Sequence, residues 1–274
     1  MTPFVCSVHT HSTFCDGAHS MAEMAAAAYG AGVQYYGFSG HAHTPCPSDI
    51  GVCMEADLTG YREEARRLQQ EYKGLMEILL GIEWDVCSDV ERNGFDYWIG
   101  SVHNLRGLEC GDYVCVDWNV EHLTDGCKRL FGGDFLSMAE AYYREVGRIA
   151  TMQPTILGHI DLITKLNDGN RLFDEEAPRY QRAALDALHA VEPESTLLEV
   201  NTGAVARGYR NAPYPAMFLL RAWQKMGGRV ILTADAHSTQ HITYGYQQAI
   251  DLVKAAGFDS TTLLTATGWK ACPI

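Results

Sequence analysis

The architecture of this 274-residue chain can be inferred from two segments, Val8-His9-Thr10-His11 near its start and Ala234-Asp235-Ala236-His237 near its end. Each segment stands at the end of an apolar, strand-like run and carries two potential metal ligands that are separated by one intervening residue. Because side chains alternate between the two faces of a strand, both members of a pair point to the same side. If the first and last strands are neighbours in a closed barrel, the two pairs converge.

Other strand-like runs end in the same residue types. These ends are Ser39-Gly40-His41, Gly81-Ile82-Glu83, Ser101-Val102-His103 and Gly158-His159. A lone buried histidine is usually a satisfied core residue, but core packing does not explain its recurrence after β-type sequence. Imidazole and carboxylate together suit Zn, Mn and Fe. Glu83 has two oxygens with which to bridge cations, and Asp16 is a further hard ligand. The pattern predicts a multinuclear metallohydrolase.

Strand-like and helix-like runs alternate along the chain. We predict strands near 4–9, 35–40, 77–83, 97–103, 155–160, 196–201 and 229–235, and helices at 22–31, 58–72, 136–150, 175–190, 215–226 and 243–256. This alternation favours an α/β fold with a closed parallel barrel, in which chemistry lies where strands end. No GxGxxG or GxxxxGK[ST] motif supports nucleotide binding.

Residues 106–135 fit this pattern poorly, because glycines such as Gly107, Gly111 and Gly126 are scattered through them and helix signals are few. They are either a surface excursion or a loop that shapes the substrate site after His103. No linker or internal repeat is evident, so we predict a single domain over residues 1–274.

Composition narrows the class of partner. Hydrophobic residues make up 47% of the chain, which suffices for a core, and the formal charge of −13 disfavours a nucleic-acid or membrane surface. The nine cysteines form no CxxC motif, and the start of the chain has no signal-peptide pattern. We therefore expect a cytoplasmic protein with reduced thiols, whose partner is a small molecule.

The candidate ligands favour phosphate chemistry. Asp16, Glu83 and Asp235 carry a combined charge of about −3, and three divalent ions would carry about +6. The pocket would then have a net positive charge, which suits a phosphate dianion. No Cys-x5-Arg loop, Asp-x-Asp pair or Gly-x-Ser-x-Gly elbow is present. Direct attack by metal-bound hydroxide is the mechanism that remains.

The ordered motifs His-x-His, Asp-Gly, Ser-x-His, Gly-x-Glu, Ser-Val-His, Gly-His and Asp-x-His resemble the polymerase-and-histidinol-phosphatase (PHP) superfamily over residues 5–240. Stretches such as Gly81-Ile82-Glu83-Trp84-Asp85 and Leu198-Glu199-Val200-Asn201-Thr202 look closest to its histidinol-phosphatase branch. The resemblance implies a distorted (β/α)7 barrel with three metal ions. The implied ligand sets are His9, His11, Glu83 and Asp235; Asp16, His41 and His237; and Glu83, His103 and His159.

The chain departs from this pattern at two places. Position 40 is Gly where the family often carries Asp or Glu, and some relatives place a histidine where we place Asp16, so His19 is a competing ligand. The sequence does not identify the metal as Mn, Zn or Fe, nor does it give the oligomeric state.

The resulting hypothesis is a metal-dependent phosphomonoesterase, with L-histidinol phosphate as the expected substrate. We expect Asp235, Glu83 and His237 to be catalytic, and Arg207, Arg210 and His43 to bind substrate. The alternatives are a relative that acts on another small phosphoester, nucleotide or phosphodiester, and a non-catalytic metal-binding barrel.

Overall fold

The computed structural model describes residues 5–107 and 112–274. Phe4, in the first predicted strand, and Gly111, in the 106–135 segment, lie outside the described residues. Within them, seven strands form one sheet with parallel neighbours. In sheet order these are β1 (Cys6–Ser7), β2 (Tyr35–Phe38), β3 (Glu77–Asp85), β4 (Tyr97–Ser101), β7 (Ile156–Leu157), β8 (Leu197–Asn201) and β9 (Arg229–Thr233). All seven predicted strands are present.

The sheet closes just beyond the ends of its first and last strands. Thr10 forms a parallel bridge with Ala236. The His11 amide donates to the Ala236 carbonyl at 2.9 Å, and the Ala236 amide donates to the His9 carbonyl at 3.0 Å. These bonds run between the two metal-ligand pairs of the sequence, so closure itself brings the pairs together. The predicted (β/α)7 barrel is confirmed.

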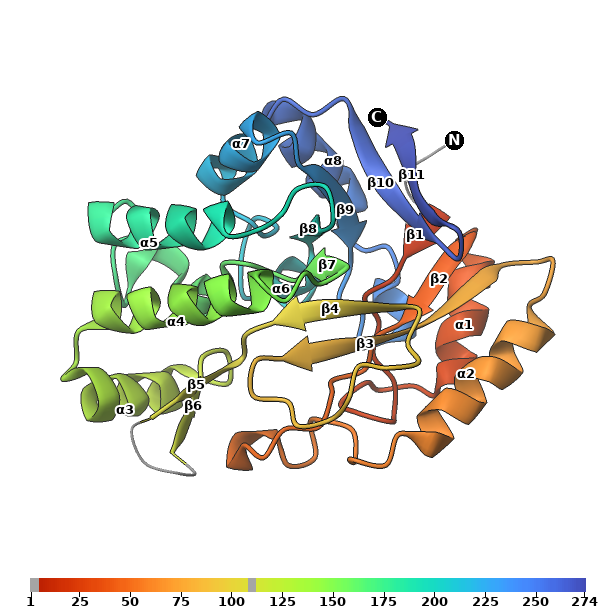
Figure 1. The fold of residues 1–274 in the computed structure, drawn as a ribbon, viewed down its shortest axis with the longest axis horizontal. Coiled ribbons are helices and arrows are strands. Elements are labelled where there is room, and N and C mark those ends of the chain that lie inside the picture. The colour runs from red at the N-terminus through yellow and green to blue at the C-terminus, as the bar shows by residue number, and fades with distance from the viewer. Residues whose placement is uncertain (1–4, 108–111) are drawn as a thin grey trace.

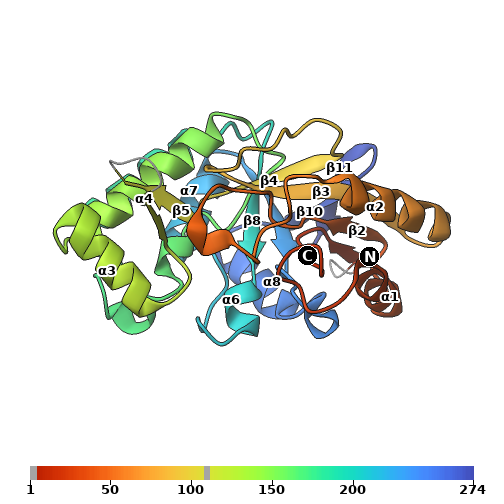
Figure 2. The same cartoon turned by 90° about the horizontal axis from the view of Figure 1, so that it is seen from below.

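Helices cover the outside of the barrel, as Figures 1 and 2 show. The six predicted ones are α1 (Met21–Gly30), α2 (Thr59–Glu71), α4 (Phe135–Ala150), α5 (Pro178–His189), α7 (Met217–Lys225) and α8 (Tyr246–Ala255). Ser20 and Glu23 form a reciprocal capping box at the start of α1, and the Asp134 carboxylate accepts two amides of α4. Shorter turns are η2 (Pro47–Asp49), η3 (Leu162–Thr164), η4 (Asp168–Asn170), α6 (Gly203–Ala206) and η5 (Thr239–His241).

The 106–135 segment contains a helix that we did not expect. A hairpin of β5 (Asn104–Arg106) and β6 (Tyr113–Cys115) leads into α3 (Val120–Phe131). Asn119 caps this helix and Gly132 ends it in the left-handed conformation at φ 61°. Gly126 obscured the pattern, but it lies where α3 approaches Val114, whose methyl groups occupy the space that a Cβ would need. Close packing therefore explains a glycine inside a helix.

Two apolar clusters form the core. The larger one fills the space between the sheet and the helices, and the smaller one fills the barrel interior. A carboxyl-terminal hairpin of β10 (Ser260–Thr265) and β11 (Gly268–Pro273), which the sequence analysis missed, contributes Leu263 and Leu264 to this interior cluster. Its partners there include Cys6, Ile156 and Leu197, at the beginnings of strands. This end of the barrel is thereby filled, and the other is left for polar side chains.

Over the described residues, no helix combines the length and apolar character needed to cross a membrane. The single domain over residues 1–274 stays a prediction.

Candidate metal centre

The side chains that follow β1 and β9 meet at the carboxyl edge of the barrel. Nε2 of His11 lies 3.2 Å from Oδ1 of Asp235, and Nε2 of His9 lies 3.6 Å from the same oxygen. The His11 and His237 rings stack with centroids 4.0 Å apart. His9 and His11 are fully buried. The convergence that we predicted from strand alternation and barrel closure is present.

Glu83, at the carboxyl end of β3, occupies the centre of the cluster. Its Oε2 lies 2.9 Å from Nδ1 of His41 and 3.2 Å from Nε2 of His9. Its Oε1 lies 2.9 Å from Nε2 of His159 and 3.4 Å from Nε2 of His103. Burial would raise the pKa of this carboxyl, but the surrounding imidazoles hold the pKa well below its ordinary value. Glu83 is therefore an anion that faces histidines from four elements.

Asp16 joins the cluster from the loop after His11. Its Oδ2 lies 3.2 Å from Nε2 of His237, and its Oδ1 lies 3.7 Å from Nε2 of His41. His19, the competing candidate, belongs to none of the metal-binding groups found among the described residues. The geometry thus brings Asp16, rather than His19, to the other candidate ligands.

The donor atoms form four overlapping groups, each with its atoms within 4.8 Å of one another. The groups are His11, Asp16, His41 and His237; His9, His11 and Asp235; His9, Glu83 and His159; and His41, Glu83 and His103. In the described structure, Nε2 of His9, Nε2 of His11 and Oε2 of Glu83 are buried, and their short contacts with one another and with the neighbouring ligands do not have the geometry of hydrogen bonds. Such atoms are costly to bury unless a ligand satisfies them. The arrangement therefore fits divalent ions held by nitrogen and oxygen.

Two carboxylates that the sequence analysis did not assign orient the histidines. Glu199 on β8 lies 2.5 Å from Nδ1 of His9 and accepts the His159 amide at 2.5 Å. Asp85 at the end of β3 accepts the His103 amide at 2.5 Å and lies 3.4 Å from Nδ1 of that residue. Such partners fix which ring nitrogen is free to bind a metal. The detectable signal was a carboxylate inside the apolar run Leu197-Leu198-Glu199-Val200.

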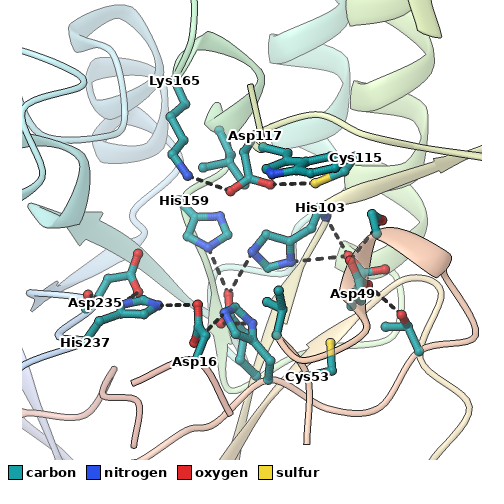
Figure 3. A pocket seen from close by; sticks show the side chains of 18 of the residues that line it. Asp16, Asp49, Cys53, His103, Cys115, Asp117, His159, Lys165, Asp235 and His237 are labelled. Carbon is teal, nitrogen blue, oxygen red and sulfur yellow. Dashed lines mark hydrogen bonds and ion pairs between the residues drawn. The ribbon is translucent and has the colours of Figure 1, made fainter. Parts of the chain in front are cut away.

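A cavity of about 470 Å³ opens over this cluster (Figure 3). Seven of the nine candidate ligands line it, and His9 and His11 lie buried behind them. Two cationic side chains, Arg207 and Lys165, also line it. Arg207 donates to Oδ2 of Asp235 at 3.0 Å and to Nδ1 of His237 at 2.9 Å. Lys165, which the sequence analysis did not single out, is paired with Asp117 at 2.8 Å.

The structure does not bring the other two predicted substrate residues to this cavity. His43 is paired with Asp89 at 2.6 Å and is not among the described residues that line the cavity wall. Arg210 lies between Glu175, at 2.9 Å, and the Thr164 carbonyl, at 3.0 Å, and is likewise absent from that wall.

A closed parallel barrel with histidines and carboxylates at the carboxyl ends of its strands defines a metal-binding (β/α) barrel. Within this class the PHP domain family matches residues 7–203, and the chain belongs to that family.

Proteins similar to this chain carry related names. The Bacillus subtilis histidinol-phosphatase is 25% identical to this chain, in an alignment that covers 89% of this chain and 97% of that protein. A proposed histidinol phosphatase from Listeria monocytogenes has the same fold, with a TM-score of 0.74 at 20% identity over 88% of this chain and 98% of its own. The structure of the Lactococcus lactis histidinol phosphate phosphatase was solved with Zn, L-histidinol and phosphate. It has a TM-score of 0.66 at 20% identity, over 96% of this chain and 98% of that protein.

Proposed function

We propose that this protein is a metal-dependent phosphomonoesterase that hydrolyses L-histidinol phosphate to L-histidinol and phosphate. The observation that carries the proposal is the convergence of nine histidine and carboxylate side chains beside a cavity that also holds Arg207 and Lys165. The names of the relatives support this substrate, as does the L-histidinol and phosphate bound to the Lactococcus lactis protein.

We propose that three divalent ions bind here. The sets are His9, His11, Glu83 and Asp235; Asp16, His41 and His237; and Glu83, His103 and His159. The mixed nitrogen and oxygen donors accept Mn, Zn or Fe, and the zinc in the Lactococcus lactis structure favours Zn. When bound, such ions polarise phosphoryl oxygens and lower the pKa of water toward neutrality.

The cavity cations have a direct role in substrate binding. Arg207 and Lys165 are the only Lys or Arg side chains among the described residues that line the cavity, so they are the groups that can clamp phosphoryl oxygens. Arg207 is already fixed by Asp235 and His237, which aims its guanidinium at the cluster. Lys165 must exchange part of its contact with Asp117 for the phosphate.

Asp235 is the residue best placed to move a proton. Burial would raise the pKa of its carboxyl, but Arg207 and nearby imidazoles hold it well below the ordinary value, so Asp235 starts as an acceptor. It would take a proton from the attacking water and return it to the leaving alcohol oxygen. Glu83 holds histidines from several strands in register, and His237 links Asp16 to Arg207.

The test is kcat/KM on Mn-loaded enzyme for L-histidinol phosphate beside other phosphomonoesters, nucleotides and a bis-aryl phosphodiester. We expect the value for histidinol phosphate to exceed the others by at least a hundredfold. Turnover of the other esters alone would retain the phosphatase mechanism and overturn the substrate. Absence of turnover with metal bound would favour the non-catalytic barrel.

A further inference from the structure

The cavity has a second wall that is not part of the metal cluster. Ser48, Asp49 and Ile50 contribute to it from η2 and the residue after it, and Asp117 and Trp118 contribute from the segment between β6 and α3. Figure 3 places Asp49 across the cavity from Asp235 and His237. A phosphoester whose phosphoryl group lies at the metals would therefore direct its alcohol toward this wall.

Asp49 places a buried carboxyl group on this wall, with an exposed fraction of 9%. Its Oδ2 accepts from Thr44 Oγ1 at 2.5 Å and from Asn104 Nδ2 at 2.8 Å. Among the residues that the structure describes, its Oδ1 accepts only from Ser48 Oγ, at 3.1 Å. Within residues 5–107 and 112–274, no Lys, Arg or His forms an ion pair with it. The other acids on the second wall and beside it have partners, because Asp117 binds Lys165 and Asp85 binds His103. Asp49 is thus held rigidly while one oxygen keeps room for an N–H donor.

The mouth of the cavity is apolar. Ile50, Trp118 and Tyr209 are 85%, 59% and 41% exposed, and all three line this one cavity. Exposed apolar side chains that gather around one opening commonly mark a ligand site. The indole of Trp118 contacts the His122 ring, with centroids 5.0 Å apart, and is otherwise largely exposed, so it offers a flat apolar face to a ligand.

We infer that Asp49 and Trp118 select the leaving alcohol, with Asp49 accepting an N–H group and Trp118 covering a flat ring. This inference rests on the proposed phosphatase function and adds to it the residues that recognise the ring and the N–H group of the leaving alcohol. Either the ammonium or the imidazole of L-histidinol supplies that donor. Discrimination of this kind is strong, because an analogue without the N–H cannot supply the additional donor to the buried Oδ1 of Asp49.

The experiment compares Mn-loaded wild type with Asp49→Asn on four esters. The first is L-histidinol phosphate. The other three are analogues of it: imidazolylpropyl phosphate lacks the amine, L-phenylalaninol phosphate lacks the ring nitrogens, and phenylpropyl phosphate lacks both. We expect Asp49→Asn to lower kcat/KM for histidinol phosphate at least tenfold, mainly by raising KM. We expect the same variant to change kcat/KM for phenylpropyl phosphate less than twofold. The analogue on which the variant loses its effect identifies the nitrogen that Asp49 binds. Asp186→Asn on the exposed face of α5 is the matched control.

Trp118 is tested with the same esters and ethyl phosphate. Trp118→Ala is expected to lower kcat/KM at least fivefold for the ring-bearing esters and to leave kcat/KM for ethyl phosphate unchanged. Trp118→Phe is expected to retain most of the activity on the ring-bearing esters. Calorimetry with the product L-histidinol is expected to show at least tenfold weaker binding to Asp49→Asn, independently of turnover.

If Asp49→Asn lowered kcat/KM equally for all four esters, the inference would be overturned, because Asp49 would then only hold Thr44 and Asn104 in place. No loss on any ester would overturn it too. Failure of the proposed substrate has a different signature, in which the wild type turns over phenylpropyl phosphate as well as histidinol phosphate. In that case 2-aminoethyl phosphate and ethyl phosphate, compared on wild type and Asp49→Asn, decide whether Asp49 binds an N–H group.

Discussion

Oε1 of Glu199 lies 2.5 Å from Nδ1 of His9, with both side chains fully buried inside the barrel. Burial would raise the pKa of Glu199, but the His9 imidazole holds it below the ordinary value, so the group is a carboxylate. A carboxylate can only accept, so Nδ1 of His9 carries the proton and Nε2 is free to face Glu83 and Asp235. A residue on β8 thereby prepares a ligand that follows β1.

Replacing Glu199 tests this role. Glu199→Gln keeps the size of the side chain but removes the charge that fixes the His9 tautomer. We expect metal affinity to fall about 10- to 100-fold, measured by competition with a chelating dye. Glu194→Gln, at the exposed turn before β8, is the control. Unchanged metal affinity in Glu199→Gln would show that the His9 tautomer does not depend on this carboxylate.

Glu83 should be the most sensitive position in the site. Glu83→Ala removes the carboxylate that contacts His9, His41, His103 and His159. We expect loss of catalysis by about three orders of magnitude or more and loss of bound metal by elemental analysis. Glu91→Ala on an exposed loop should behave as wild type. Full metal content in Glu83→Ala would contradict the proposed ligand sets.

The two candidate arginines should separate clearly. Arg207→Ala is expected to raise KM or lower kcat about tenfold or more without unfolding the protein, since Arg207 reaches Asp235 and His237. Arg210→Ala is expected to lower the melting temperature and leave kcat/KM within about threefold, because Arg210 pairs with Glu175. Steady-state kinetics and thermal denaturation, measured on each variant and on the wild type, test both expectations. A large rise in KM for Arg210→Ala would support our prediction from sequence that it binds substrate.

Metal removal provides a test that does not need mutation. Three clustered anions and six imidazoles lose their shared partner when a chelator strips the ions, so the apoprotein should melt at a lower temperature and lose activity. Readdition of Mn, Zn or Fe should restore both, and titration should reach three ions per chain. Restoration with a single ion per chain would refute the trinuclear proposal.

Asp161 predicts a pH dependence of stability. Burial raises the pKa of this carboxyl to about 6, and its Oδ1 has no hydrogen-bond partner in the described structure. The folded state therefore keeps a proton that the unfolded chain releases near pH 4, so the Asp161 contribution to stability falls as pH rises from about 4 to 6. Asp161→Asn does not titrate, and we expect its stability relative to wild type to rise by up to about 3 kcal/mol over that window.

Urea denaturation at pH 4 and pH 7, with metal present throughout, measures this difference. Asp168→Asn, at an exposed position in η4, is the control. A stability difference between Asp161→Asn and wild type that does not change with pH would show that Asp161 titrates normally in the folded protein.

Much of the barrel was predictable from local patterns. Alternating apolar runs predicted seven strands and six helices, because hydrophobic periodicity is encoded over a few residues. The same patterns failed at α3, where Gly126 serves a contact with Val114 of another element. They also failed at the β10–β11 hairpin, whose Leu263 and Leu264 fill the barrel interior. Both failures concern packing between segments that are distant in sequence or in different elements.

The sequence by itself indicated the chemistry of the site, because histidine and carboxylate side chains are recognisable metal ligands. The period of a strand does not set the geometry of the two pairs, since both lie just beyond β1 and β9 and Asp235 has φ 48°. Only the tertiary structure decided which side chains meet across the barrel. Strand order brings Glu199 to His9 across 190 residues, and barrel closure joins Thr10 to Ala236. It also separates Arg207, which faces the cavity, from Arg210, which does not. The physical reason is that hydrogen bonds and ion pairs depend on distances of a few ångströms, and only the packed chain sets these distances between remote residues.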